Sequence, residues 1–329
     1  MKTITLEEHF VTQSFLQATG AYGHDAPPQL AAIQPKLLDL GAERIARIDE
    51  AAIDVQVLSL ATIGIDKLDA VHATAMMTEV NDELADAIKA NPTRLAGFAA
   101  LNMKDPKSAA KELERCVTKL GFAGALVNGT VASCEGPLFL DDARYSPFWE
   151  AAVQCGVPVY LHPAPAPEIV QKAYFSGLPG ELGMLLSIAG WGWHAELGLH
   201  TLRLIVSGLF DRWPGLQLII GHMGEGLPYA MARSSAVLSG AAHLKQTVAD
   251  YFKSNIHLTT SGYFSQPPLK CALEVVGIDR TLFSVDYPFS PTTHGKKFLQ
   301  DAAAWLGETE MQKLMGGNAQ KLLRLSSFS

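Results

Sequence analysis

The chain has 329 residues, of which 48% are hydrophobic and 18% are charged, and its formal net charge is −7. The basic residues form no run, which argues against a general affinity for nucleic acid or anionic membrane. We find no apolar stretch long enough to cross a membrane and no signal peptide in MKTITLEEHF. The widely spaced Cys116, Cys134, Cys155 and Cys271 are typical of reduced thiols, so we expect a cytoplasmic protein.

Short apolar segments recur along the chain and predict eight strands. These lie at residues 3–8, 55–60, 95–101, 124–129, 157–163, 216–222, 256–263 and 281–288. Helical patterns alternate with them, at residues 41–51, 68–91, 106–119, 145–155, 186–212, 225–240, 267–277 and, in pieces, 296–324. This alternation is typical of parallel strands covered by helices, and eight units predict an α/β fold, a (β/α)₈ TIM barrel. No G-x-G-x-x-G follows the first strand, which disfavours an open dinucleotide-binding sheet.

Two segments rich in proline and glycine interrupt this alternation. Residues 11–40 follow the first strand and residues 163–185 follow the fifth. We expect both to be loop insertions at the mouth of the barrel, where active-site loops belong. The chain as a whole, residues 1–329, is predicted to be one barrel domain.

Four charged or imidazole side chains fall at the carboxyl ends of predicted strands, where barrel enzymes carry their active sites. Glu7 and His9 share one face of the first strand, with Glu8 on the other face. His162 ends the fifth strand and Asp286 the eighth. Two carboxylates and two neutral imidazoles suit a divalent ion such as Zn²⁺ or Mn²⁺. Taken singly, each has a structural interpretation, such as a turn at Asp286, but together they predict a metal site.

Two further motifs indicate chemistry near the same rim. In GHMGEGLP, His222 ends the sixth strand and Glu225 follows three residues later. Such a pair can act as a general acid or base near neutral pH, although Glu225 is also compatible with helix capping. In GWGWHAELGLH, Trp191 follows a predicted mouth loop and either lines a pocket or packs in the core.

Seven segments together resemble the amidohydrolase-related aromatic acid decarboxylases, most closely the γ-resorcylate (2,6-dihydroxybenzoate) and 2,3-dihydroxybenzoate decarboxylases. They are TLEEHF, ALVNG, YLHP, RLIVSGLFDRWPGLQLIIGHMGEGLPY, LTTSG, LFSVDYPF and GGNAQKLL. The resemblance implies a distorted barrel and a metal-dependent, nonoxidative decarboxylase without an organic cofactor. It also implies a homo-oligomer, a homotetramer or a dimer, and a role in the catabolism of aromatic compounds.

The resemblance also implies roles for individual residues. The metal ligands of the family fall on Glu7, His9, His162 and Asp286. Its catalytic histidine falls on His222, with Glu225 as the partner. Positions that line or approach its substrate site fall on Asn128, Phe289 and Arg233. This chain differs from γ-resorcylate decarboxylases around that site, with DYPFSP for a DWPFEN-like segment and RSSAV for a RIDHR-like segment.

The reaction expected from this resemblance is reversible loss of CO₂ from an ortho-hydroxybenzoate, such as a dihydroxybenzoate or a salicylate-type acid, to give a phenol. Asp286 is the candidate donor of a proton to the ring, with His222 as the alternative donor. The rival function is a mononuclear metal-dependent hydrolase of a lactone or amide. The fourth strand, GALVNG, has no lysine that could bridge two metal ions. A barrel without catalysis is the third possibility.

Overall fold

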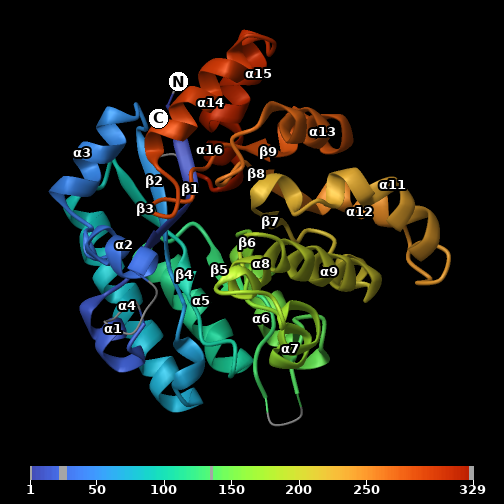
Figure 1. Ribbon diagram of the computed structural model, residues 1–329, viewed down its shortest axis with the longest axis horizontal. Coiled ribbons are helices and arrows are strands. Elements are labelled where there is room, and N and C mark those ends of the chain that lie inside the picture. Colours follow the sequence, from blue (N-terminus) through green and yellow to red (C-terminus); the bar gives the residue numbers. More distant parts are fainter. Residues whose placement is uncertain (1, 22–27, 134–135, 326–329) are drawn as a thin grey trace.

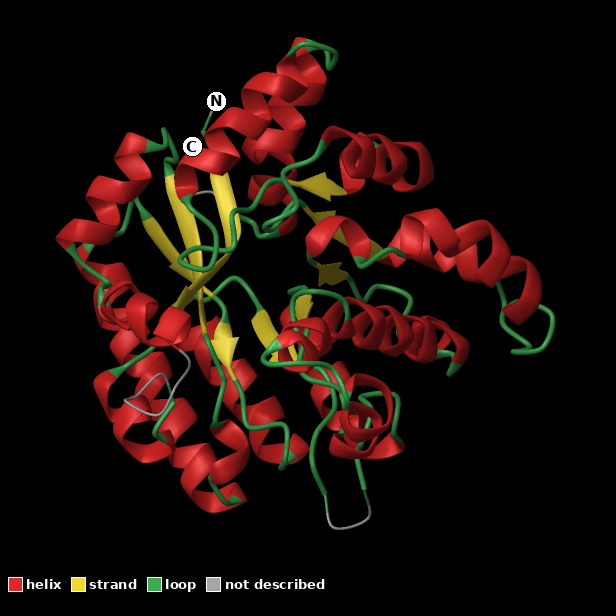
Figure 2. Cartoon of the chain, in the orientation of Figure 1, coloured by secondary structure: helices red, strands yellow, loops and turns green. Residues whose placement is uncertain are grey.

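A ring of short parallel strands lies at the centre of the computed structural model, and helices surround it (Figures 1 and 2). The structure describes residues 2–21, 28–133 and 136–325. The strands of these residues are β1 (Ile4–Phe10), β2 (Val55–Leu60), β3 (Leu95–Gly97), β4 (Ala99–Ala100), β5 (Ala125–Asn128), β6 (Val159–His162), β7 (Leu218–Ile220), β8 (Ile256–Thr259) and β9 (Thr281–Leu282). They pair in parallel as β1-β2-β3 and as β4 through β9 in order.

The pieces β3 and β4 are one strand that breaks at Phe98. Phe98 donates its backbone N–H to Leu58 of β2 at 2.9 Å, whereas Ala99 donates to Gly124 beside β5, also at 2.9 Å. The broken strand therefore pairs with β2 on one side and with β5 on the other, and it joins the two sheets.

The ring closes where β1 meets the segment after β9. His9 donates its backbone N–H to Tyr287 at 2.7 Å, and Asp286 donates to Glu7 at 3.0 Å. Glu8 forms a parallel bridge with Tyr287. Because β1 also pairs with β2, the strands form a complete circle, and the predicted barrel is confirmed.

The last strand is shorter than predicted, since β9 covers only two residues of the expected 281–288. The side chain of Glu8 explains the difference. It is buried and accepts hydrogen bonds from the backbone N–H groups of Val285 at 2.9 Å and Tyr287 at 3.2 Å. A carboxyl group thus accepts hydrogen bonds that a neighbouring strand would otherwise accept.

Helices cover the outside of the ring (Figure 1). In the described residues they are α1 (Gln13–Thr19), α2 (Pro28–Leu38), α3 (Ala42–Glu50), α4 (Ala70–Ala90), α5 (Pro106–Leu120), α6 (Ser146–Cys155), α7 (Glu168–Phe175), α8 (Leu182–Ser187), α9 (Gly192–Val206), α10 (Leu209–Arg212), α11 (Leu227–Leu238), α12 (Val248–Asn255), α13 (Gln266–Val276), α14 (Thr292–Ala303), α15 (Glu308–Gln312) and α16 (Asn318–Leu322). None of the described helices is long and apolar enough to cross a membrane.

The two segments expected as loop insertions are partly helical. Residues 11–40 carry α1 and α2, and residues 163–185 carry α7 and the start of α8. Thr12 caps α1 by accepting a hydrogen bond from the backbone of Phe15 at 3.1 Å, and Phe15 and Leu16 are buried. A cap and two buried apolar side chains stabilise a helix that is too short to give a periodic pattern.

Three of the four cysteines, Cys116, Cys155 and Cys271, are free thiols, as expected. Cys134 lies outside the described residues.

His200 on α9 couples the fold to pH. It is buried, and its Nε2 accepts a hydrogen bond from the backbone N–H of Leu140 at 3.0 Å. Burial lowers the pKa of His200 from 6.5 to about 4. Between these values the unfolded chain binds a proton that the folded chain does not, so stability falls as the pH falls from 6.5 towards 4.

We therefore predict that His200→Gln makes the protein less sensitive to acid. Glutamine can accept the same hydrogen bond but has no charge to gain. Relative to pH 7, the wild-type free energy of unfolding should fall by up to about 3 kcal/mol more than that of the variant at pH 4. Urea titrations at both pH values measure this difference, and equal losses in the two proteins would contradict it.

Candidate active site

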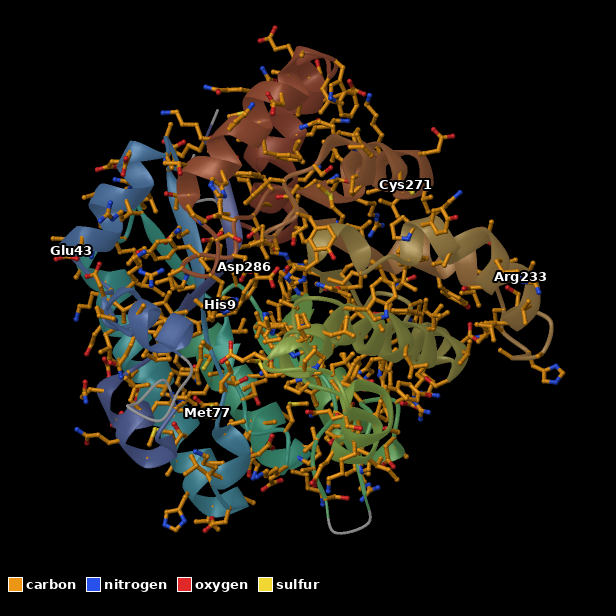
Figure 3. The ribbon with its side chains drawn as sticks, in the orientation of Figure 1. His9, Glu43, Met77, Arg233, Cys271 and Asp286 are labelled. Carbon is orange, nitrogen blue, oxygen red and sulfur yellow. The ribbon has the colours of Figure 1, made fainter. Side chains whose placement is uncertain are left out.

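The four side chains predicted to bind metal converge inside the rim of the barrel. Glu7 and His9 come from β1, His162 ends β6, and Asp286 follows β9. His162 Nε2 lies 3.3 Å from Glu7 Oε1, and His9 Nε2 lies 3.2 Å from Asp286 Oδ1. Figure 3 shows His9 and Asp286 close together near the centre of the ring. The geometry brings the four groups together, and their role as ligands stays a prediction.

The unpaired atoms at this point fit a cation. Glu7 Oε1 and His9 Nε2 are buried and have no hydrogen-bond partner among the described residues. One donor atom from each of Glu7, His9 and His162 lies within 4.8 Å of the others. Buried polar groups without partners are costly unless a ligand satisfies them, so this donor set suits a divalent ion.

In His162 and His9, Nε2 faces the centre of the site, and Nδ1 contacts a neighbouring oxygen atom. His162 Nδ1 lies 2.8 Å from the carbonyl oxygen of Pro163, which can only accept a hydrogen bond. The proton of neutral His162 is therefore on Nδ1, and the lone pair of Nε2 faces Glu7. His9 Nδ1 lies 3.3 Å from Ser59 Oγ, a hydroxyl group that can accept a hydrogen bond from Nδ1 or donate one to it. Hydrogen bonds of this kind orient metal-binding histidines.

Glu7 is held as a carboxylate by hydroxyl groups and imidazoles. Tyr160 and Ser261 donate their hydroxyl groups to Oε2, which leaves Oε1 directed at the histidines. Burial raises the pKa of Glu7, but the pKa is held well below its ordinary value, chiefly by the nearby charge of His222. Glu7 therefore brings a negative charge into the centre of the barrel.

Asp286 brings a second carboxyl group to the same point. Its backbone lies in the left-handed region at φ 71°, which few residues other than glycine adopt. Burial and the carboxylate of Glu7 raise its pKa to about 7. Two carboxyl groups so close together in a buried site repel each other when both are ionised, and a divalent cation between them would remove that repulsion.

His222 and Glu225 form the expected pair beside this group. Both lie in the turn after β7 and both have positive φ, 49° and 57°. His222 Nδ1 lies 2.7 Å from Glu225 Oε1, while His222 Nε2 lies 3.9 Å from Glu7 Oε1 and 4.0 Å from Asp286 Oδ2. Burial disfavours a charged His222, yet Glu225 and Glu7 raise its pKa to about 10. Glu225 does not cap α11, which begins at Leu227 and has no side-chain cap.

The sequence analysis missed His194, which lies on α9 beside this pair. Its Nδ1 lies 2.5 Å from Glu225 Oε2, and its Nε2 lies 3.0 Å from the carbonyl oxygen of Ala189. The ring of Tyr263 packs edge-on against both His194 and His222. Glu225 follows His194 by 31 residues, so no local pattern could have identified the contact.

Three residues predicted to contact substrate lie in different surroundings. Asn128 is the register partner of His162, and its Oδ1 is buried without a partner among the described residues. The ring of Phe289 packs edge-on against His9 at 5.5 Å between centroids and is 38% exposed. Trp191 precedes α9 and is 60% exposed, so it is not a core residue.

Arg233 does not lie at the site in this chain, and its predicted place near the site is wrong. It is exposed on α11, and Figure 3 shows it at the periphery, far from His9 and Asp286. The helix begins at Leu227 and buries Leu227, Pro228 and Met231. At about 1.5 Å per residue, the helix carries Arg233 away from the rim and on its outer side.

Comparisons with known proteins show what the whole chain is similar to. The model of the amidohydrolase family (Amidohydro_2) matches residues 33–325. The γ-resorcylate decarboxylase of Polaromonas sp. is 39% identical over 98% of both chains. The crystal structure of dihydroxybenzoic acid decarboxylase from the same organism, with bound manganese and the inhibitor 2-nitroresorcinol, has a TM-score of 0.89 at 38% identity over 98% of this chain and 97% of that chain. A 2,6-dihydroxybenzoate decarboxylase complexed with 2,6-dihydroxybenzoate also has a TM-score of 0.89, at 36% identity over 98% and 99% of the two chains.

Gly221, at the end of β7, provides a test of the predicted metal site that leaves all four ligands intact. A Cβ atom there would lie 2.6 Å from Glu7 Oε2 and 3.1 Å from the hydroxyl oxygen of Tyr160. We predict that Gly221→Ala displaces the Glu7 carboxylate and lowers the affinity for Mn²⁺ by about 10- to 100-fold. The control is Gly215→Ala, since a Cβ atom at Gly215 would meet no atom within 4 Å. Isothermal titration of the metal-free proteins with Mn²⁺ measures the affinities, and equal values would contradict the assignment.

Proposed function

Because the chain belongs to the amidohydrolase family, we propose that it is a metal-dependent, nonoxidative decarboxylase of an ortho-hydroxybenzoate such as a dihydroxybenzoate or a salicylate-type acid. The observation that carries this proposal is the convergence of Glu7, His9 and His162, with Asp286 3.2 Å from His9, beside the His222–Glu225 pair. The full-length similarity to γ-resorcylate decarboxylases supports the same chemistry. Nothing in the site favours the alternative, a hydrolase.

We assign the divalent cation to Glu7, His9, His162 and Asp286, whose donor atoms suit Mn²⁺ or Zn²⁺. The manganese in related crystal structures favours Mn²⁺. When bound, the cation supplies Lewis-acid polarisation and a fixed orientation for an acid with a neighbouring phenolic oxygen. No organic cofactor is part of the proposal.

The chain's own residues move the proton that the reaction requires. The ring carbon that carries the carboxylate gains a proton, its bond to that carboxylate breaks, and the bonding electrons return to the ring as CO₂ leaves. Asp286 is the proposed donor, and His222 is the alternative, because Asp286 Oδ2 and His222 Nε2 lie 4.0 Å apart. Glu225 keeps the Nδ1 edge of His222 occupied, which directs Nε2 towards the reacting group.

The experiment that tests this function measures CO₂ release from a panel of hydroxybenzoates by the Mn²⁺-loaded enzyme. We predict turnover only with acids that have a hydroxyl group ortho to the carboxylate. His162→Ala should lose both metal and turnover, whereas His222→Ala should keep one Mn²⁺ per chain and lose about 10²- to 10⁴-fold in kcat. A wild-type enzyme that hydrolyses lactones or amides but releases no CO₂ would refute the proposal, and loss of metal from His222→Ala would make His222 a ligand.

We place this reaction in the catabolism of aromatic compounds and in the cytoplasm. The free thiols of Cys116, Cys155 and Cys271 support a reducing compartment.

We also propose that the chain forms a homo-oligomer, a tetramer or a dimer. Large apolar side chains are exposed in the segment from α7 to α11: Ile169, Tyr174, Leu178, Leu182, Met184, Leu185, Leu186, Trp191, Leu199, Tyr229 and Val237. Tyr229 is the most exposed of these side chains, at 92%. Many exposed large apolar side chains in one part of a chain are typical of an interface between subunits.

Charged substitutions test this interface. We predict that Leu185→Glu combined with Tyr229→Glu lowers the mass measured by sedimentation from that of an oligomer to that of a monomer, because each carboxylate would have to be desolvated on association. Val71→Glu is the control, since Val71 is also exposed but lies on α4. A wild-type protein that sediments as a monomer would refute the proposal.

A further inference from the structure

We propose that His194 is a positioning residue for the reaction, because it fixes Glu225 and through Glu225 the orientation of His222. The kinetic consequences of this inference rest on the proposed function. Its structural basis is a chain of three hydrogen bonds, which runs from the backbone of Ala189 to the imidazole beside Glu7 and Asp286.

Donors and acceptors are fixed along this chain. The carbonyl oxygen of Ala189 can only accept, so the Nε2 of His194 carries a proton. The next contact, 2.5 Å between His194 Nδ1 and Glu225 Oε2, must also hold a proton, because two lone pairs would repel at that distance. The third contact places a proton between Glu225 Oε1 and His222 Nδ1. Each oxygen of Glu225 is therefore bound to a different imidazole.

Glu225 needs both partners to keep one orientation. Its backbone is in the left-handed region at φ 57°, and its carboxylate is buried. Without His194, Oε2 would be a buried acceptor without a partner, a state that proteins avoid by rotating the side chain or admitting water. Either change would release the Nδ1 edge of His222. His194 thus acts on the reacting groups only through Glu225 and His222.

His194 itself is anchored to backbone in a tight turn. It is the third residue of α9, and Ala189 lies in the turn between α8 and α9. The turn is crowded, because a Cβ atom on Gly192 would lie 2.2 Å from the carbonyl oxygen of Ser187. The backbone here has little room to move, so the hydrogen bond to Ala189 gives the imidazole of His194 a fixed reference point.

A second cation is the other way to explain this group. His194, His222 and Glu225 place ligand atoms within 4.8 Å of one another. However, an ion with ligands at about 2.0–2.2 Å would hold neighbouring nitrogen and oxygen atoms about 3 Å apart or more. The observed separations of 2.5 and 2.7 Å are those of charge-assisted hydrogen bonds. The geometry therefore favours protons at both contacts.

Three substitutions at this position separate the two hydrogen bonds of His194. Asparagine places an amide N–H near the position of Nδ1 and keeps the bond to Glu225, whereas glutamine places it near Nε2 and keeps only the bond to Ala189. Phenylalanine keeps the shape and makes neither bond. On the Mn²⁺-loaded enzyme we expect His194→Gln and His194→Phe to lower kcat by about 10- to 100-fold with little change in KM. His194→Asn should restore kcat to within about threefold of wild type.

The matched control is His200→Gln, which replaces another buried histidine on α9 that binds the backbone of Leu140. It should leave kcat at neutral pH unchanged. All variants should retain one Mn²⁺ per chain. Equal activity in His194→Phe and wild type would overturn the proposal, as would equal losses in His194→Asn and His194→Phe. A second ion per chain that disappears in His194→Phe would also overturn it.

A readout independent of turnover separates this inference from the proposed function. In Zn²⁺-loaded protein with ¹⁵N-labelled histidine, we expect the Nδ1–H resonance of His222 to be the same in wild type and His194→Asn, and to be shifted or broadened in His194→Phe. An unchanged resonance in His194→Phe would refute the positioning role. If no hydroxybenzoate reacts, the proposed function fails, but these spectra still decide whether His194 orients His222.

Discussion

The placement of two carboxyl groups inside the rim of the barrel is the constraint on which the rest of the site depends. Glu7 is fully buried beside His162, and Asp286, which is partly buried, lies beside His9. Charges taken out of water must be compensated by opposite charge and hydrogen bonds. Hydroxyl groups satisfy one oxygen of Glu7, which leaves the other oxygen and His9 Nε2 for the cation that we propose.

The backbone that places these groups is held together by a third acid, Glu8. Its carboxyl oxygens accept hydrogen bonds from the N–H groups of Val285 and Tyr287, so the segment that carries Asp286 is attached to the strand that carries Glu7 and His9. Backbone hydrogen bonds between β1 and this same segment close the barrel. Glu7 faces the candidate site while Glu8 holds the segment, because neighbouring side chains of a strand point in opposite directions.

The sequence was sufficient to predict the barrel and the convergence of the four groups on its rim, because apolar strands and their terminal residues are local signals. It was not sufficient where an element depends on a single cap or on distant contacts. The helices α1 and α7 are too short to show a period. Arg233 was assigned from resemblance, and the length of α11 places it elsewhere. His194 contacts Glu225 only through the fold.

The histidines at the rim are of two kinds, which differ in the group that contacts Nδ1. Nδ1 of His162 faces a carbonyl oxygen and Nδ1 of His9 faces a serine hydroxyl, and both partners are neutral, so either imidazole can offer the lone pair of Nε2 to the proposed cation. His222 faces the carboxylate of Glu225, which stabilises a charged imidazole and so allows Nε2 to hold a proton. The roles that we propose for these histidines, metal binding and proton transfer, therefore follow from the group that contacts Nδ1, and β1, β6 and the turn after β7 position the imidazoles beside those different groups.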